Sequence, residues 1–305
     1  MTKFASRALF ALVVLTFSTA ASAEPVRWYL QGVTFSDGGR AVGSFVFDSD
    51  TGTYTEIDIA TTIGTELPGA DYGDPNPDSP SDSTGLLSVA DDTANPLTGQ
   101  PLLALGFTQA LGNAGGTITI DPAGLSFEGK CGQSGMQECG LVVVARDITA
   151  GVVSSDKPGA HINAGMNGSW FNPLTPGQGI LVDVFPDIPL VFLAWFTFDV
   201  SQPQAGLPPA TVGDINHRWL TAQGTFRGNE AVLDVFLTTG GLFNDPAMVS
   251  VTNPNRYGRI VLTYSDDCRS GTMEFELFEQ QLSDILPIER IADDNVPLCM
   301  ELDQE

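Results

Sequence analysis

Short runs in which apolar and polar residues alternate follow one another along most of the chain. In the first half their apolar members lie two residues apart, as in Phe45 and Phe47, Ile57 and Ile59, and Ile118 and Ile120. Period-two alternation is typical of a strand with one buried and one solvated face. Gly, Pro, Asn and Asp separate the runs, as expected for turns. The pattern therefore predicts an antiparallel β protein.

The second half contains eight further runs of this kind. They are Gly168–Asn172, Gly179–Phe185, Leu190–Phe198, Arg218–Phe226, Glu230–Thr238, Tyr257–Ser265, Gly271–Leu277 and Ile285–Ile291. Sequential strands with mostly short connections predict an up-and-down meander that closes into a barrel, because closure removes exposed edges. The only helix that we expect after the N-terminus is a single turn at Leu282–Ile285.

The predicted fold class is all-β with two domains, an antiparallel β-sandwich followed by an antiparallel up-and-down barrel. A boundary is expected where Ser154-Ser155-Asp156-Lys157-Pro158-Gly159 follows a strand. We assign residues 1–23 to a signal peptide, 24–153 to the first domain, 154–163 to a linker and 164–305 to the second domain.

Two segments depart from the pattern of one buried and one solvated face. Both faces of Leu190–Phe198 are apolar, so we expect something to cover its outer face. The other domain or a second sheet is the expected cover, and a partner surface is the alternative. Residues Glu66–Ser83 hold four aspartates and four prolines, which predicts an extended surface loop.

The N-terminus has the layout of a secretory signal peptide. Lys3 and Arg7 precede the apolar run Ala8–Phe17, and Ala21-Ser22-Ala23 supplies a small-residue cleavage site. Cleavage near Ala23/Glu24 would give a secreted or periplasmic protein. The apolar run is shorter than the ~20 residues that span a bilayer, and no later segment is longer, so we expect no membrane insertion.

The formal net charge of -24 limits the classes of macromolecule that the protein is expected to bind. An acidic surface of this kind repels nucleic acid and anionic membranes, so a nucleic-acid partner is not expected. Charged residues make up only 16% of the chain, against 42% hydrophobic residues, so the acids lie on a sequence that can form a core.

Four cysteines in an exported protein indicate disulfides. The pairs Cys131–Cys139 and Cys268–Cys299 are favoured, because each lies within one predicted domain. A zinc site is the alternative, although no C-x-x-C is present and His161 and His217 are distant from every cysteine in sequence.

Two motif-bearing segments resemble modules of uncharacterised secreted proteobacterial proteins. The first domain carries Gly32-Val33-Thr34-Phe35-Ser36-Asp37-Gly38-Gly39 and Gly43-Ser44-Phe45-Val46-Phe47-Asp48, a module that often occurs with surface-sorting tails. The second opens with Gly168-Ser169-Trp170-Phe171-Asn172-Pro173, followed by Gly177-Gln178-Gly179. The resemblance implies secretion and association with a surface, and it supplies no catalytic residues.

Aromatic side chains are the main candidates for ligand contact. Trp170, Phe171, Trp195 and Trp219 could form a stacking platform or line a barrel mouth, and core packing is the alternative. A carbohydrate or a cell-surface partner would suit such a platform.

The metal candidate is Asp48-Ser49-Asp50-Thr51-Gly52, which offers Asp48 and Asp50 to Ca²⁺. It lacks the later glutamate of a calcium-binding loop, and a plain hairpin turn is the favoured explanation. No other cofactor is expected.

A non-catalytic binding or surface-associated protein is the leading hypothesis. A hydrolase that uses carboxylates such as Asp183, Glu274 or Glu276 is the competing class. A Ser–His–acid triad would need His161 or His217 as its base, and neither lies in a sequence motif for that chemistry.

Overall fold

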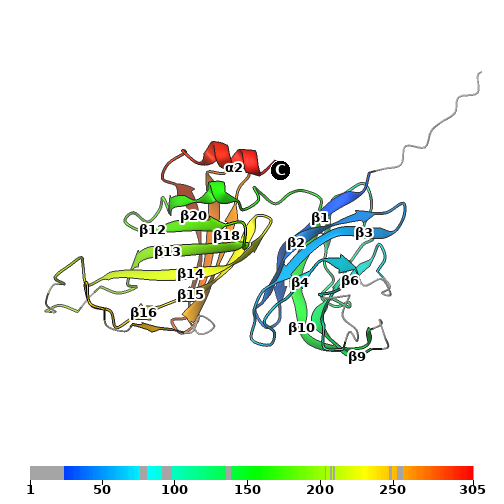
Figure 1. The fold of residues 1–305 in the computed structure, drawn as a ribbon, viewed down its shortest axis with the longest axis horizontal. Coiled ribbons are helices and arrows are strands. Elements are labelled where there is room, and N and C mark those ends of the chain that lie inside the picture. Colours follow the sequence, from blue (N-terminus) through cyan, green and yellow to red (C-terminus); the bar gives the residue numbers. More distant parts are fainter. Residues whose placement is uncertain are drawn as a thin grey trace, which may run out of the picture.

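The computed structural model describes residues 24–75, 81–90, 98–134, 139–202, 204–206, 208, 210–246, 249–252 and 257–304. They form two β domains that lie side by side (Figure 1). The predicted all-β class with two domains is therefore confirmed. The predicted signal peptide, residues 1–23, lies outside the described residues. Within them, no helix is long and apolar enough to cross a membrane.

The sandwich expected for the first domain is a single antiparallel sheet that wraps almost completely around one core. Its strands are β1 (Val26–Phe35), β2 (Arg40–Asp48), β3 (Thr53–Thr61), β4 (Asp71–Tyr72), β5 (Asp74–Pro75), β6 (Gly85–Val89), β7 (Pro101–Gly106), β8 (Thr117–Thr119), β9 (Phe127–Ser134) and β10 (Cys139–Ser154). The long strand β10 pairs with β9 through its first half and with β1 through its second half. It therefore joins strands β1–β4 to strands β5–β7 and β9 in one continuous sheet.

The two ends of this sheet, β4 and β5, are separated in sequence by Gly73 alone. The expectation of an extended surface loop over Glu66–Ser83 is thus wrong for Asp71–Pro75. The side chain that decides this is Tyr72, which is buried and donates a hydrogen bond of 2.8 Å to Glu128 Oε1. Residues 76–80 lie outside the described residues.

A buried charge network explains the Gly32–Gly39 motif of the first domain. Arg146 donates to Glu128 at 2.8 Å and to Asp37 at 3.1 Å, and all three side chains are at most 1% exposed. A Cβ on Gly39 would lie 2.1 Å from the Arg146 guanidinium, and one on Gly64 would lie 2.1 Å from Asp37. The two glycines therefore make room for a fully paired network, which is how charges are tolerated inside a protein.

The second domain is a closed eight-stranded barrel of up-and-down order. Its strands are β11 (Gly168–Phe171), β12 (Gly179–Phe185), β13 (Leu190–Phe198), β14 (His217–Arg227), β15 (Glu230–Phe236), β18 (Gly258–Tyr264), β19 (Ser270–Leu277) and β20 (Leu282–Arg290), and β20 pairs with β11. A short hairpin of β16 (Thr238–Thr239) and β17 (Ser250–Val251) interrupts the order. The predicted barrel is confirmed, while Leu282–Ile285 is strand rather than helical turn.

Side chains fill the barrel interior. Trp170, Val191, Leu193, Leu233 and Ile260 are fully buried in one continuous cluster. Barrels of eight strands are just wide enough for side chains to fill them, so the interior of this one is a packed core.

One end of the barrel is closed by the 3₁₀ helix η1 (Ala164–Met166) and the helix α2 (Val296–Leu302). The Arg290 guanidinium lies 4.4 Å from the centre of the Trp170 ring and donates to the carbonyls of Gly165 and Cys268. The disulfide Cys268–Cys299 ties α2 to the turn before β19, as predicted. The Cys139 side chain lies outside the described residues, so the second predicted pair, Cys131–Cys139, stays a prediction.

Candidate functional site

The four aromatic residues predicted to contact a ligand do not lie together. Trp170 is fully buried and Trp195 is 6% exposed, and both point into the barrel core. Phe171 is partly exposed at the end of β11. Trp219 on β14 is 54% exposed. The core therefore uses two of the predicted rings, and Trp219 is the tryptophan that presents its ring to solvent.

The predicted calcium ligands form a hairpin turn between β2 and β3. Asp48 Oδ1 accepts hydrogen bonds from the Asp50 amide at 2.9 Å and from Asn113 Nδ2 at 3.2 Å, and Oδ2 accepts from the Thr51 hydroxyl at 2.8 Å. The Asn113 side chain, together with the Asp50 amide and the Thr51 hydroxyl, lowers the pKa of Asp48. Among the described residues, no group of three His, Cys, Asp or Glu side chains could hold a metal ion.

A row of three residues across neighbouring strands forms the centre of an aromatic groove on the outer face of the barrel. In the register of the sheet, Gly179 of β12 is opposite Phe196 of β13, and Phe196 is opposite Trp219 of β14. Phe196 is 46% exposed. In the next row out, Phe198 is opposite His217, and their ring centres are 5.5 Å apart. The groove between these rings has a volume of about 390 Å³.

The Gly177-Gln178-Gly179 motif shapes one side of this aromatic groove. Gly177 has a φ of +84°, and a Cβ at this position would lie 3.4 Å from the Phe198 ring. Gly179 is opposite Phe196 and adds no side chain to the outer face. Gly177 therefore leaves room beside the Phe198 ring that a larger residue would fill.

Polar groups surround the rings. The Arg218 guanidinium donates to Asp199 Oδ2 at 2.6 Å and to the Ile215 carbonyl at 2.9 Å. The bond from Arg218 lowers the pKa of Asp199, so this carboxylate is ionised at neutral pH. Thr197 donates to Gln178 Oε1 at 2.5 Å. Of these groups, Thr197 and Arg218 line the groove together with the rings.

Among the described residues, the expected cover is absent at the end of β13. Phe196 and Phe198 are 46% and 38% exposed, whereas Leu190, Phe192 and Ala194 on the same face are partly buried. The first domain contacts the other end of β14, where Arg227 lies 3.1 Å from Asp58 and 3.0 Å from Asp71. Trp219 and Arg227 are eight residues apart on one strand, which is roughly 26 Å. The aromatic groove is therefore well separated from the domain junction.

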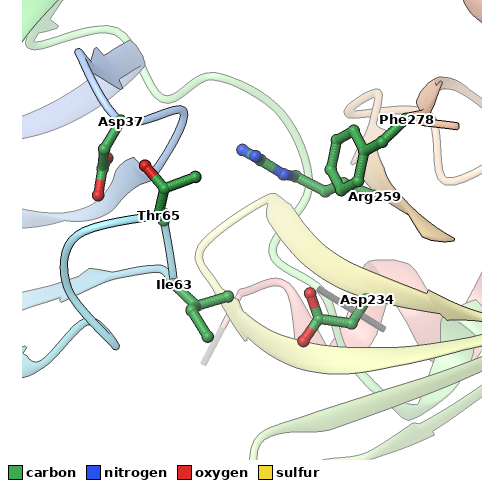
Figure 2. Close-up of a pocket in the computed structure, with 7 residues that line it drawn as sticks. Asp37, Ile63, Thr65, Asp234, Arg259 and Phe278 are labelled. Atoms are coloured by element: carbon green, nitrogen blue, oxygen red, sulfur yellow. The ribbon is translucent and has the colours of Figure 1, made fainter. Parts of the chain in front are cut away.

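A second recess lies between the two domains (Figure 2). Asp37, Ile63 and Thr65 line it from the first domain, and Asp234, Arg259 and Phe278 line it from the barrel; its volume is about 250 Å³. Burial raises the pKa of Asp234 and lowers that of Arg259, and the attraction between the two opposes both shifts. Arg259 also donates to the carbonyl of Gly38.

Several charges at this junction form ion pairs across the two domains. Arg40 lies 2.7 Å from Glu274 and 3.7 Å from Glu230. Asp37 accepts a hydrogen bond from Arg146, and its negative charge compensates the buried guanidinium. The arrangement holds the two domains together through ion pairs, and Glu274, one of the carboxylates considered for a hydrolase, takes part in it.

The residues considered for catalysis are dispersed. Asp183 is exposed on β12 opposite Phe192, and it lines neither the aromatic groove nor the junction recess. His217 Nδ1 accepts from the Asp214 amide at 3.2 Å. His161 lies 6.4 Å from the Tyr29 ring, and burial together with Lys157 lowers its pKa. Among the described residues, no serine hydroxyl forms a hydrogen bond with either imidazole.

Sequence reasoning missed Phe196 and Phe198 as members of the candidate site. The available signal was the apolar outer face of Leu190–Phe198, for which the sequence favours a cover by the other domain or a second sheet over a partner surface. No protein-family model, curated protein or solved structure matches this chain. The case for function therefore rests on the aromatic groove itself.

Proposed function

We propose that the protein is an exported, non-catalytic binding protein whose aromatic groove recognises a neutral carbohydrate. In this proposal residues 1–23 direct export and are removed near Ala23/Glu24, and the mature protein acts outside the cytoplasm. The disulfide Cys268–Cys299 supports an oxidising compartment.

The observation that carries the proposal is the cross-strand row Gly179–Phe196–Trp219, with both rings exposed on the outer face. A single exposed apolar residue is ordinary, whereas a tryptophan and a phenylalanine opposite each other present a contiguous apolar surface, and such surfaces often mark a ligand site. A sugar ring has an apolar face of C–H groups that stacks on such rings, and a rim of hydroxyl groups that needs hydrogen-bond partners. Thr197 and Arg218, which line the groove, would supply those partners.

Size and charge favour a neutral saccharide over a protein partner. The groove volume of about 390 Å³ lies in the range of roughly 300–1,000 Å³ that is typical of small-ligand sites. A stable protein interface covers about 800 Å² on each partner, which is far more than the surface of the Phe196, Phe198 and Trp219 rings. The Arg218–Asp199 pair is neutral as a unit, and the formal net charge of -24 repels acidic polysaccharides.

Native affinity electrophoresis tests the proposal. The mature protein is run in gels that contain soluble xylan, galactomannan, β-glucan or hydroxyethyl cellulose. At least one of these neutral polysaccharides is expected to retard the wild-type protein but not the Trp219→Ala variant. The matched control is Phe243→Ala, which removes an aromatic ring that is 86% exposed outside the groove. The proposal fails if no polysaccharide retards the protein, or if Trp219→Ala is retarded equally.

A further inference from the structure

A larger recess lies on the outer surface of the first domain, far in sequence from the aromatic groove. It has a volume of about 640 Å³ and lies over β6, β7 and the turn before β9. Its apolar wall follows one row of the sheet, because Leu87 is opposite Ala104 and Ala104 is opposite Phe127. Ala104 and Phe127 belong to a small apolar cluster that is separate from the main core of the domain. We call this recess the β6–β7 pocket.

The adjacent row of the sheet gives the pocket its depth. Gly85 of β6 is opposite Gly106 of β7, so two neighbouring positions carry no side chain. Leu125, which is 79% exposed, stands at the rim beside them. Phe107 also lines the pocket. The result is an apolar depression whose volume suits a ligand of small-molecule size.

Carboxylates flank this second row at both sides. The backbone of Asp82 bridges to Gly85, and the amide of Asp121 donates to the Gly106 carbonyl at 2.8 Å. Asp82 Oδ1 accepts from both the Thr84 hydroxyl at 2.6 Å and the Thr84 amide at 2.7 Å, which orients that carboxylate. Both aspartates line the pocket. No basic side chain is among the residues that line it in the described part of the chain.

The geometry points to the β6–β7 pocket as a binding site for an amphipathic small molecule with a cationic head and an apolar body. The body would lie along Leu87, Ala104 and Phe127, and the head would lie between Asp82 and Asp121. Burial of the apolar chain provides the binding free energy. The two carboxylates select the sign of the head group, because an anionic head would meet like charge.

Isothermal titration calorimetry with three matched probes tests this inference. Dodecyltrimethylammonium and dodecanoate, both below their micellar concentrations, share the alkyl chain and differ in head charge, while tetramethylammonium is the head alone. We expect saturable 1:1 binding of dodecyltrimethylammonium, binding of dodecanoate that is about tenfold weaker or more, and no measurable binding of tetramethylammonium. Equal affinity for the two alkyl probes, or no saturable binding of either, would overturn the inference.

Two variants locate the site without disturbing the core. Asp82→Asn should weaken dodecyltrimethylammonium about three- to tenfold and leave dodecanoate unchanged or tighter. Leu125→Gln should weaken both alkyl probes. The matched control is Leu174→Gln, which changes a leucine that is 76% exposed on the barrel and should change neither. Loss of affinity in Leu174→Gln, or none in Asp82→Asn and Leu125→Gln, would place binding elsewhere. Trp219 does not line the β6–β7 pocket, so Trp219→Ala should bind dodecyltrimethylammonium like the wild type. The two proposals can therefore fail independently of each other.

Discussion

Phe196 and Trp219 are directly opposite each other on β13 and β14, and both rings point away from the barrel core. Their inward neighbours, Trp195 and Leu220, also form a cross-strand pair. The barrel thus carries large apolar side chains on both sides of the same two strands. Only the inner side is needed for packing, which leaves the outer pair available for a ligand.

Truncation of either outer ring should weaken binding without unfolding the protein. Phe196→Ala and Trp219→Ala should each reduce saccharide affinity about tenfold, because a central aromatic contact contributes about 1.4 kcal/mol or more. Both positions are about half exposed, so the melting temperature should change little. Calorimetric titration measures the first effect and differential scanning calorimetry the second. A tenfold loss of affinity accompanied by a large fall in melting temperature would contradict this interpretation.

The Arg290–Trp170 contact should stabilise the closed end of the barrel. Arg290→Leu removes the cation–π contact and leaves the carbonyls of Gly165 and Cys268 without their donor, at a cost of about 2–4 kcal/mol. Denaturant unfolding of the mature protein measures this loss. Arg269→Leu is the control, because Arg269 pairs with Asp293 in solvent and should contribute less than about 1 kcal/mol. Equal losses in the two variants would refute the role of Arg290.

Reduction of Cys268–Cys299 should release α2 from the barrel. The loop spans 31 residues, for which the chain-entropy relation gives about 3–4 kcal/mol as an upper value. We expect the Cys268→Ala/Cys299→Ala variant to unfold at lower denaturant concentration. Amide exchange should rise first in Val296–Leu302, the segment that the bond anchors. Unchanged exchange in α2 would show that packing against η1 holds the helix by itself.

The buried carboxylate at the domain junction predicts a pH dependence. Burial raises the pKa of Glu230 above the ordinary value of 4.5, with Arg40 opposing and Glu274 adding to the shift. The stability that protonated Glu230 contributes is complete below pH 4.5 and is lost as the pH rises through the raised value. Glu230→Gln should therefore match the wild-type melting temperature at low pH and exceed it at neutral pH.

Melting curves of both proteins across pH 4–8 check this. Glu289→Gln, which changes an exposed glutamate on β20, is the control and should follow the wild type. A constant difference between Glu230→Gln and the wild type at every pH would count against the assignment.

Strands whose pattern is local could be predicted from the sequence, and contacts that depend on distant residues could not. The eight barrel strands were predicted with bounds that differ by a few residues at most. The helix α2 was missed, because seven residues hold too little periodicity and the helix depends on Cys299. Strands β4 and β5 were missed, because Tyr72 is fixed by Glu128, which is 56 residues away.

The candidate site was only partly predictable for a related reason. Both faces of Leu190–Phe198 are apolar, so alternation alone could not tell whether Trp195 or Phe196 points outward. The register with β12 and β14 decides it, since Ile180, Trp195 and Leu220 share the inner face. Trp219 was among the predicted residues, but the groove needs its neighbours on two other strands.

Acrylamide quenching of tryptophan fluorescence tests the central claim most directly. All four tryptophans lie in the described part of the chain, and Trp28, Trp170 and Trp195 are at most 6% exposed, so Trp219 is the quenchable one. With a polysaccharide that retards the protein, the account predicts that saturating ligand abolishes most of the quenching, and that Trp219→Phe shows little quenching with or without ligand. Quenching of the wild type that bound saccharide leaves unchanged would contradict it.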